Sequence, residues 1–549
     1  MKQNILLIKQ GEGMTNITSC KMTDIKTFEF SKNKFEEIRK YSFGSNWPVV
    51  YLIENGKELY VGETINVYSR SNQHYEDPER RKLSKIHVIT DEEYNKSATL
   101  DIESSLIQYI SADGRFILQN GNHGLKNHNY FDRQKYQAKF EAIWTELQKI
   151  QLTQNDLVQI KNSDLFKYSP YKALTIDQRA VADELLHEIK SGNERAYIVN
   201  GDPGTGKTIL ATYLFKQLSE IKETKHLKVA LVVPMTGLRG TLKKIFKNIK
   251  GLSAKMVIGP SDVTEKYDIL IVDEAHRLKQ RKNITNYKSF DDNNKLLGLN
   301  LDATELDWIM KCSKSQILFY DKNQSVRPSD LSPAKFEELV VRKFELKLQL
   351  RIGGGGDGEK YIKFIQDIFD LTKIDNDKFN NYDFKVYDDI EKMILDIKSK
   401  NSQMDLCRMV SGYAWPWISK NNPDMHDIEI GSVKLKWNSV NHNWVYSPNA
   451  VNEVGCIHTV QGYDLNYAGV IIGPEISYDP IKKKFIVFPE KYMDMNGKRG
   501  VSDIDELERY IINIYKTLLT RGIHGTYVYI VDDDLRNYFK ESLLNKIKI

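Results

Sequence analysis

Short apolar runs that end in glycine or polar residues recur along the chain and predict the strands of α/β domains. Near the start, Pro48–Glu54 and Lys57–Gly62 flank Asn55-Gly56. This pattern predicts a β-hairpin, because Asn-Gly favours the tight turn that joins two twisted strands. Helical periodicity follows from about residue 66 and again over Ala98–Ile110. Together these segments predict a small α+β domain.

Four further apolar runs follow, and each ends in polar residues. They lie at 196–199, 228–233, 268–272 and 316–320. A helical segment, Thr208–Leu218, comes after the first run. Repeated strands with polar ends predict a RecA-like parallel sheet that binds its ligand at the carboxyl ends of the strands. A second sheet is expected to begin at Lys347–Arg351.

The loop after the first of these runs matches the P-loop pattern G-x-x-x-x-G-K-[ST]. Backbone N–H groups of such a loop wrap a phosphate, and the helix behind it favours negative charge. Lys207 is expected to reach the β and γ phosphates of ATP, and the Thr208 hydroxyl to bind Mg²⁺. A glycine-rich turn without ligand is disfavoured by the flanking strand and helix. The expected nucleotide-binding positions are Gly201, Gly204, Thr205, Gly206, Lys207 and Thr208.

Acidic and amide side chains follow two later runs. Asp273, directly after an apolar run, is expected to hold Mg²⁺, and its neighbour Glu274 to polarise the attacking water. His276 either couples hydrolysis to movement or forms a local hydrogen bond. Gln324 closes a D-x-x-Q segment and is a candidate sensor of the γ-phosphate.

Gln178 has two interpretations that the sequence leaves open. With Thr175 three residues before it, Gln178 completes a helix capping box. Its position about thirty residues before Lys207 also suits a glutamine whose amide reads adenine through one donated and one accepted hydrogen bond. The two roles are compatible.

Residues 174–535 resemble a superfamily 1 helicase core. Thr459-Val-Gln461-Gly462 resembles helicase motif V, and the segment around Arg521 resembles motif VI. Arg351 and Arg521 then suit arginine fingers, since guanidinium charge stabilises phosphoryl transfer. Each arginine by itself is more often a surface or ion-pair residue. Gln461 is an auxiliary candidate.

The Trp415-Pro-Trp417 and His-Thr-Val-Gln-Gly-Tyr-Asp segments are most similar to a Schlafen-related bacterial P-loop family. Members of that family often carry a GIY-YIG nuclease module at the N-terminus. The two tryptophans suit base stacking, but the proline between them favours a packed corner of the structure.

The N-terminal hairpin resembles that nuclease module over roughly residues 46–145. Val49-Val50-Tyr51 stands where the GIY-YIG family has GIY, and Tyr60-Val61-Gly62 where it has YIG. Valines replace the glycine and isoleucine of the first half-motif. Further polar positions follow in the order of the family: Arg70, Glu103 and Asn120.

By this resemblance, Glu103 holds a divalent metal ion and Tyr51 helps to deprotonate the attacking water. Arg70 stabilises the phosphate, while Tyr60 and Asn120 position groups around it. His74, one helical turn from Arg70, is auxiliary. The alternative is a domain of ordinary strand tyrosines and one salt-bridged glutamate, which binds nucleic acid without cutting it.

Composition constrains the class of protein. The chain has 549 residues, enough for two to four domains, and is 41% hydrophobic. No apolar run approaches a membrane span, and the Ile5–Ile8 run is too short for a signal-peptide core, so a cytoplasmic location is expected. The four cysteines lie far apart, which argues against a zinc ribbon or a disulfide framework. A net charge of +5 gives no general indication of nucleic-acid binding.

The expected fold class is α/β: a small α+β GIY-YIG domain followed by two RecA-like parallel-sheet lobes. The expected order is an N-terminal extension (1–45), a GIY-YIG domain (46–145), a linker (146–173), lobe 1 (174–345) and lobe 2 (346–549). We expect an ATP-dependent nucleic-acid translocase or helicase coupled to a metal-dependent endonuclease, with DNA preferred over RNA by family resemblance. A role in defence or DNA processing is an analogy with bacterial fusions. The alternatives are an ATP-gated switch with a non-cutting arm and an enzyme that cleaves RNA, including tRNA.

Overall fold

The computed structural model describes residues 24–120, 130–193, 195–339, 341–352, 357–374, 379–440, 443–501 and 503–544. Cys20 and the first half of the expected N-terminal extension lie outside these residues. The chain forms two compact units. The first comprises the described residues up to Ile110 together with 118–120 and 130–157, and the second contains the remainder. Among the described residues, no helix has the length and apolar character needed to cross a membrane.

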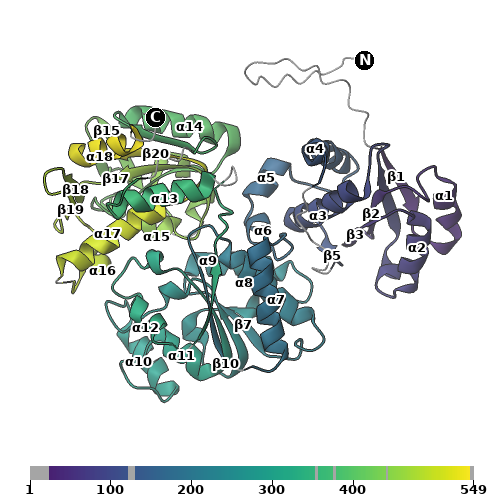
Figure 1. Ribbon diagram of the computed structural model, residues 1–549, viewed down its shortest axis with the longest axis horizontal. Helices are drawn as coiled ribbons and strands as arrows, with labels where there is room; N and C mark the ends of the chain where they lie inside the picture. Colours follow the sequence, from purple (N-terminus) through teal and green to yellow (C-terminus); the bar gives the residue numbers. More distant parts are fainter. Residues whose placement is uncertain are drawn as a thin grey trace. The chain divides into compact units, whose positions relative to one another are not determined.

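The first unit is built on a five-stranded sheet with the strand order β1-β4-β2-β3-β5 (Figure 1). Its strands are β1 (Asp24–Glu29), β2 (Val49–Glu54), β3 (Glu58–Thr64), β4 (Lys85–Thr90) and β5 (Ile117–Leu118). The predicted hairpin is confirmed: β2 and β3 pair antiparallel, with Glu54 opposite Leu59. Gly56 in the turn has φ +83°, a conformation that glycine adopts without steric cost.

Residues 24–45, assigned above to an extension, contribute to this first unit. β1 pairs along its whole length with β4. Phe28, Phe35 and Ile38 are buried in the same core as Tyr51 of β2. The helices of the unit are α1 (Phe35–Lys40), α2 (Val67–Glu76), α3 (Lys96–Asp113) and α4 (Arg133–Lys149).

The second unit begins with lobe 1, whose sheet has the order β11-β6-β10-β9-β7-β8. All of its strand pairs are parallel, as the sequence predicts for a RecA-like lobe. The strands are β6 (Ala196–Gly201), β7 (Val229–Val232), β8 (Val257–Ile258), β9 (Tyr267–Val272), β10 (Ser313–Tyr320) and β11 (Arg342–Leu346).

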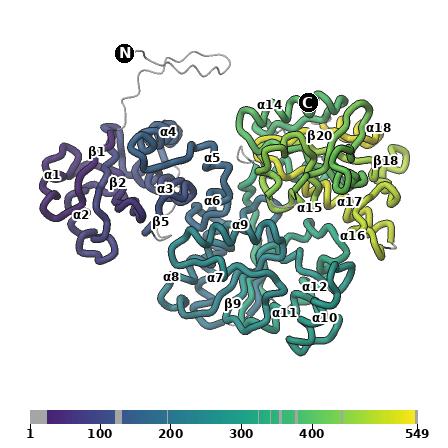
Figure 2. Tube along the Cα trace, turned by 180° about the vertical axis from the view of Figure 1, so that it is seen from behind, coloured from purple at the N-terminus to yellow at the C-terminus, as the bar shows by residue number. Residues whose placement is uncertain are grey.

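Helices cover both faces of this sheet. The helices are α7 (Ile176–Lys190), α8 (Lys207–Glu220), α9 (Thr236–Lys247), α10 (Tyr287–Leu296), α11 (Glu305–Cys312) and α12 (Pro333–Glu337). α7, α8 and α9 lie on one side, and α10, α11 and α12 on the other (Figures 1 and 2). Both faces of the strands are therefore buried, which explains why the predicted runs are continuously apolar rather than alternating.

Lobe 2 contains a sheet with the order β12-β20-β17-β13-β16-β15-β14. Its strands are β12 (Asp383–Tyr387), β13 (Cys407–Ser411), β14 (Ile428–Ile430), β15 (Val433–Trp437), β16 (Glu453–Cys456), β17 (Leu465–Ile472) and β20 (Gly522–Ile530), with a separate hairpin of β18 (Ile476–Asp479) and β19 (Lys484–Val487). Its helices are α13 (Asp357–Phe369), α14 (Ile390–Met404), α15 (Ile457–Val460), α16 (Met495–Lys498), α17 (Ile504–Leu519) and α18 (Asp533–Leu544). α14 packs on one face of the sheet, and α13, α17 and α18 pack on the other.

The prediction that a second sheet begins at Lys347–Arg351 is wrong. The preceding strand, β11, belongs to the sheet of lobe 1, and the sheet of lobe 2 starts at β12. The backbone of 347–351 pairs with no strand, because other groups occupy its N–H donors. The Asp177 carboxylate accepts from two of them, and the Gly204 carbonyl accepts from two more.

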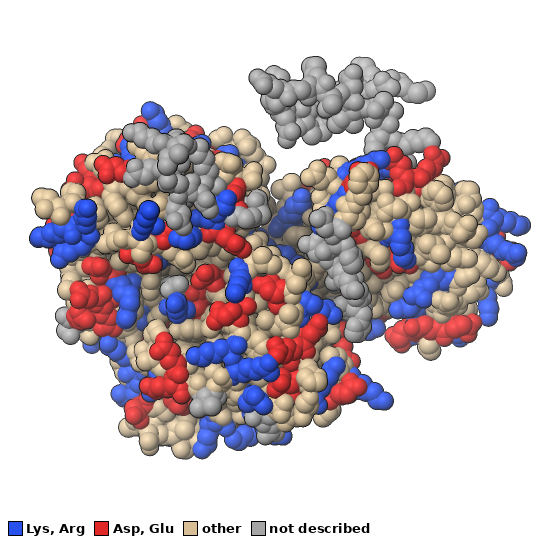
Figure 3. Space-filling model, in the orientation of Figure 1, with Lys and Arg blue, Asp and Glu red and all other residues tan. Residues whose placement is uncertain are grey.

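Residues 158–173, assigned above to a linker, fold onto the second unit. They contain most of α5 (Leu157–Asn162) and all of α6 (Asp164–Lys167). The Tyr168 hydroxyl donates to the Gly462 carbonyl at 2.6 Å, and the Asn162 amide donates to the Met404 carbonyl at 3.0 Å. The segment is therefore part of the folded second unit. Acidic and basic side chains are interspersed over the face shown in Figure 3, in keeping with the small net charge.

Asp177 joins the start of α7 to the end of β11. Its carboxylate accepts from the backbone N–H of Lys347 at 3.0 Å and of Leu348 at 3.2 Å. Burial opposes ionisation of this carboxyl. The Thr175 hydroxyl and the backbone donors outweigh that effect and hold its pKa below the usual value.

Replacing Asp177 by alanine is expected to lower the free energy of unfolding by about 1–2 kcal/mol at neutral pH, because the Thr175 hydroxyl and the backbone N–H groups of Lys347 and Leu348 lose their acceptor. Since the folded-state pKa is depressed, this stabilisation is present above the unfolded pKa of about 3.9 and is lost as the pH falls through the folded value. Urea unfolding at pH 7 and pH 3 measures both effects. Asp183→Ala, which removes an exposed pair with Arg179, is the control; an equal loss there would contradict the assignment.

Candidate functional site

The P-loop joins β6 to α8 as the sequence predicts. Gly204 has φ +87° and Gly206 has φ +77°, in the left-handed region where glycine is favoured. α8 begins directly afterwards at Lys207, with Gly206 as its N-cap. The first-turn N–H groups of a fourteen-residue helix therefore point into the loop, where they can bind an anion.

The Lys207 ammonium lies inside this loop and is 6% exposed. It donates to the Gly201 carbonyl at 2.5 Å and to the Asp202 carbonyl at 3.2 Å. Its third partner is the Asp321 carboxylate at 3.1 Å. The ammonium group is thus fixed at the carboxyl ends of β6 and β10, the edge at which parallel sheets bind ligands.

Thr208 and Asp273 offer two adjacent oxygens. The Thr208 hydroxyl donates to the Asp273 carboxylate at 2.7 Å, and Asp273 is fully buried. Burial and the neighbouring Glu274 raise the pKa of Asp273 to about 7. Among the described residues, no three or more His, Cys, Asp or Glu side chains gather as a metal site. Mg²⁺, however, is usually held by one or two protein oxygens together with substrate phosphates, and this pair fits that requirement.

Glu274 sits in a strained conformation beside the P-loop. Its backbone is left-handed, with φ +53°, which is costly for a residue with a side chain and is found at functional sites. Its carboxylate lies 3.0 Å from a ring nitrogen of His276. Burial opposes its ionisation, but the His276 ring and Lys207 lower its pKa to about 2. Glu274 is therefore ionised at neutral pH, as a group that orients water must be.

A chain of polar side chains continues from the P-loop into lobe 2. The Gln324 amide donates to the Asp321 carboxylate at 2.6 Å, on the oxygen that also faces Lys207. The Gln324 carbonyl accepts from the Arg521 guanidinium at 3.3 Å. Arg521 is 2% exposed, and burial together with Arg351 lowers its pKa to about 10. Asp321 was missed by the sequence analysis, although it opens the D-x-x-Q segment.

Two further predicted residues contact the loop. The Gln178 amide donates to the Thr205 carbonyl at 2.8 Å, and its carbonyl accepts from the Thr175 N–H at 3.1 Å. The capping box is thus confirmed, and the same side chain also braces the P-loop. Arg351 donates to the Asp464 carboxylate, while its backbone N–H donates to the Gly204 carbonyl.

A cavity of about 230 Å³ is lined by part of the predicted set, without Gln178, Asp273 and Arg521. Its lining from the predicted set is Gly204, Gly206, Lys207, Thr208, Glu274, Gln324 and Arg351. The sequence analysis missed Lys161, Lys167, Tyr168 and Lys172, which also line it. Three lysines interleaved with aromatic residues just before the Gln178 segment are the signal that would have revealed them.

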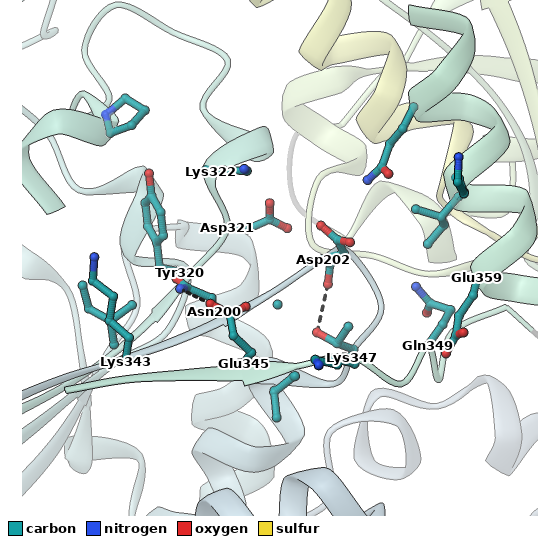
Figure 4. A pocket seen from close by; sticks show the side chains of 18 of the residues that line it. Asn200, Asp202, Tyr320, Asp321, Lys322, Lys343, Glu345, Lys347, Gln349 and Glu359 are labelled. Atoms are coloured by element: carbon teal, nitrogen blue, oxygen red, sulfur yellow. Dashed lines mark hydrogen bonds between the residues drawn. The ribbon is translucent and has the colours of Figure 1, made fainter. Parts of the chain in front are cut away.

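A larger cavity of about 680 Å³ lies next to the P-loop (Figure 4). Asp202 and Asp321 reach it from the ends of β6 and β10, and Glu345 reaches it from β11. The Asn200 amide donates to Glu345 at 2.6 Å. Of the predicted positions, Gly201 and Thr205 line this cavity, whereas Lys207 and Thr208 line the smaller one, to which we therefore assign the nucleotide.

Gln461 lines a separate cavity of about 250 Å³ between the two lobes, together with Thr236, Gly237 and His458. The Gln461 side chain is 4% exposed, and both amide atoms have no hydrogen-bond partner among the described residues. A buried amide without partners costs free energy, which a ligand with a donor and an acceptor can recover.

The first unit has its own polar cluster. The Tyr51 hydroxyl lies 2.7 Å from Nε2 of His74, and the ring centroids of Tyr60 and His74 are 4.8 Å apart. The sequence analysis missed Arg80. Its guanidinium nitrogen lies 2.7 Å from Nδ1 of His74, and its guanidinium carbon lies 4.0 Å from the centroid of the Tyr60 ring.

These contacts determine the tautomer of His74. An arginine only donates, so Nδ1 of His74 accepts and carries no proton. Burial and the charge of Arg80 also lower the pKa of His74 to about 3, so the ring is neutral. Its proton is then on Nε2 and is donated to the Tyr51 oxygen. Burial and Tyr60 raise the pKa of Tyr51, whereas a hydrogen bond from Arg70 lowers it.

Glu103 lies on α3 within electrostatic reach of Tyr51 and Arg70. Burial and the neighbouring Glu63 raise the pKa of its carboxyl to about 7. Glu63 itself pairs with Lys96. Two carboxylates that repel each other fit a divalent cation, which would relieve the repulsion. The structure thus brings the predicted Tyr51, Arg70, His74 and Glu103 into one cluster.

Asn120 and Gly62 act on the strand that carries Tyr60. The Asn120 side chain donates to the Val61 carbonyl at 2.8 Å and accepts from the Val61 N–H at 2.9 Å, so it continues the sheet beside β3. Gly62 is directly opposite Tyr51, and a Cβ at Gly62 would lie 2.3 Å from the Tyr51 hydroxyl oxygen. The glycine of this half-motif is therefore required by the tyrosine of the other.

The all-parallel sheet of lobe 1, the largely parallel sheet of lobe 2, the P-loop and the polar chain between the lobes define the second unit as a P-loop protein of the helicase-like class. Residues 194–532, more than half of the chain, match the family described as Schlafen group 3, DNA/RNA helicase domain. The chain belongs to this family.

Other comparisons include one relative and, among the matching structures, two distant ones. The uncharacterized protein YPL245W of Saccharomyces cerevisiae is 29% identical over 388 residues, which are 62% of this chain and 82% of that protein. The Bacteroides Pif1 helicase with ADP-AlF3 and ssDNA is 10% identical, covers 69% of this chain and 98% of its own, and has a TM-score of 0.26. A second structure, Bacteroides Pif1 bound to ssDNA, is 11% identical, covers 67% and 94%, and scores 0.27. Scores this low add nothing to the assignment.

Gly62→Ala is expected to destabilise the first unit by about 1–3 kcal/mol, because the added methyl group overlaps the Tyr51 hydroxyl and forces the ring to move. Thermal unfolding of the full chain measures the loss. Gly62→Ala combined with Tyr51→Ala should recover most of the cost of the glycine substitution, since the clash is gone. Equal costs of the glycine substitution with and without Tyr51 would refute the pairing.

Proposed function

We propose that the second unit is an ATP-driven nucleic-acid translocase or helicase and that the first unit is a metal-dependent phosphodiester endonuclease, with DNA as the preferred substrate. The observation that carries the motor proposal is the continuous chain Lys207–Asp321–Gln324–Arg521, which connects the phosphate-binding loop to the second lobe. A change at the phosphates can reach lobe 2 through this chain.

The residues in and around the nucleotide cavity have separate roles in this proposal. Lys207 and the loop N–H groups bind the phosphates, and the ionised Glu274 orients the attacking water. Arg521, together with Arg351, supplies positive charge from the lobe 2 side. Thr208 and Asp273 would hold Mg²⁺, which neutralises phosphate charge when bound. Gln178 braces the loop against α7.

The cavity lined by Gln461 is the proposed track for nucleic acid. It lies between the lobes, so closure around ATP would change its shape. The Gln461 amide, which has no hydrogen-bond partner among the described residues, supplies one donor and one acceptor to a strand. The family description supports nucleic acid as the partner.

In the first unit, we propose that Tyr51 accepts the proton of the attacking water. The donors on either side, His74 and Arg70, stabilise its deprotonated form. Arg80 acts through His74, whose tautomer it holds. Glu103, with Glu63 beside it, would hold a divalent ion, which activates water and stabilises the charge that develops on phosphate.

A second candidate, a first unit that binds nucleic acid without cutting it, is favoured by one observation. Tyr51 is 1% exposed, and burial raises its pKa, which opposes loss of its proton. Under this alternative the protein is an ATP-gated switch with a recognition arm. Cleavage of RNA, including tRNA, is the other alternative. The experiments below distinguish them.

Glu274→Gln is expected to lower the ATPase rate by about 10²–10⁴-fold while nucleotide binding is kept, because the amide cannot take a proton from water. Lys207→Ala should lose nucleotide binding itself. The rate is measured with and without single-stranded DNA, duplex DNA and RNA. Glu265→Gln, at an exposed glutamate paired with Lys228, is the matched control. A rate in Glu274→Gln equal to that of the control would reject this role, and a rate indifferent to every nucleic acid would favour the switch.

Glu103→Gln is expected to abolish cutting of labelled DNA in Mg²⁺ while the ATPase rate stays unchanged, since the two clusters lie in different units. Glu141→Gln, at an exposed glutamate of α4, is the control. The same assay with labelled tRNA separates a DNA enzyme from an RNA enzyme. If the unmodified protein leaves both substrates intact with Mg²⁺ or Mn²⁺, the non-cutting arm is favoured. If Glu103→Gln cuts as well as the control, the site assignment fails.

A further inference from the structure

One stretch of lobe 1 carries much more positive charge than the chain as a whole. Residues 224–261 contain no Asp or Glu. They contain eight basic residues: Lys225, Lys228, Arg239, Lys243, Lys244, Lys247, Lys250 and Lys255. The whole chain has a net charge of only +5. Such a local excess is the electrostatic signature of a surface that attracts phosphates.

α9 lies in the middle of this stretch and presents an ordered face. Gly237, Gly240, Lys244 and Lys247 follow each other at intervals of three, four and three residues, so they share one side of the helix. Gly240, Lys244 and Lys247 are exposed, whereas the opposite side of the helix packs into the protein through Leu242 and Phe246. We call Gly237, Gly240, Lys244 and Lys247 the α9 stripe.

The fold does not require the two glycines of the stripe. Neither has a positive φ. A Cβ at Gly240 would meet nothing within 4 Å, and at Gly237 it would make only ordinary contact with the Tyr463 hydroxyl at 3.4 Å. Glycine inside a helix is less favourable than alanine, so two of them weaken α9 without a structural return. Close approach of a partner outside the chain is a reason for glycine at such positions.

The stripe begins at a cavity that contains a buried amide without a hydrogen-bond partner among the described residues. Thr236 and Gly237, at the N-terminus of α9, line the cavity that contains the unpartnered Gln461 amide. The N-terminus of this twelve-residue helix favours an anion. Gln461 is an independent indication that a polar ligand enters there.

We propose that a nucleic-acid strand leaves this cavity along the α9 stripe. Its phosphodiester backbone passes closest to the helix at Gly237 and Gly240, where side chains are absent, and its phosphates then pair with Lys244 and Lys247. The stripe is about 15 Å long, from the helical rise over ten residues. An acidic protein segment shares the attraction to lysine, but it gives no reason for an exposed Gly240 one helical turn beyond Gly237, which lines the Gln461 cavity. This inference rests on the proposed nucleic-acid function and assigns it a path.

The test measures binding of the full chain to a fluorescein-labelled single-stranded oligonucleotide, dT20 or rU20, by anisotropy over a series of salt concentrations. Lys244→Gln with Lys247→Gln should reduce the slope of log affinity against log salt by about 2, one for each lost phosphate contact. Gly240→Leu should weaken binding several-fold and leave the melting temperature of the protein equal or higher, because leucine is the better helix former. Lys398→Gln, at an exposed lysine of α14, is the control and should change neither quantity.

Each outcome separates this path from the proposed function. If the unmodified protein binds the oligonucleotide and the α9 variants bind it with the same slope and affinity, the path is overturned and the function stands. If the unmodified protein binds neither oligonucleotide, the proposed function fails and the path fails with it. If the variants lose binding to poly-glutamate but keep binding to the oligonucleotide, the stripe serves an acidic protein and the path is overturned.

Discussion

The second unit depends on the way one buried ammonium group is neutralised. Lys207 has two backbone carbonyls and one carboxylate around it, and that carboxylate belongs to the next strand of the sheet. Burial of a cation is costly unless it is paired, so Asp321 must lie where it does for the P-loop to close. Asp321 also accepts a hydrogen bond from Gln324, and Gln324 accepts one from Arg521 of lobe 2. The position of lobe 2 therefore affects how the charge of Lys207 is neutralised. A phosphate that competes with Asp321 for Lys207 therefore acts on both lobes.

Local patterns were sufficient to predict most of this fold. Periodicity and turn chemistry, which act over short distances, predict the Asn-Gly hairpin, the P-loop with its flanking strand and helix, and the all-parallel sheet of lobe 1. The second sheet was placed too early, because Lys347–Arg351 has the composition of a strand while its N–H groups are taken by Asp177 and Gly204. Those acceptors lie far away in the sequence, and no local pattern reveals them.

The functional sites show the same difference between local patterns, which the sequence reveals, and contacts between distant residues, which it does not. The resemblance of the hairpin to a nuclease family pointed to Tyr51, and motif spacing pointed to Lys207 and Glu274, which follow the ends of β6 and β9. It missed Asp321 and Arg80, whose roles come from contact with another side chain rather than from a motif. It also treated residues 158–173 as a connector, since only the folded chain shows their lysines at the nucleotide cavity.

The contact of Tyr51 with Gly62 has a consequence for variation among relatives. The two positions face each other across the hairpin, and the ring occupies the space that any side chain at position 62 would need. A relative that replaces the tyrosine by a small residue frees position 62 from its restriction to glycine, whereas a relative that keeps the tyrosine cannot relax it. Positions 51 and 62 therefore constrain each other, and substitutions at the two should occur together in proteins that contain this hairpin.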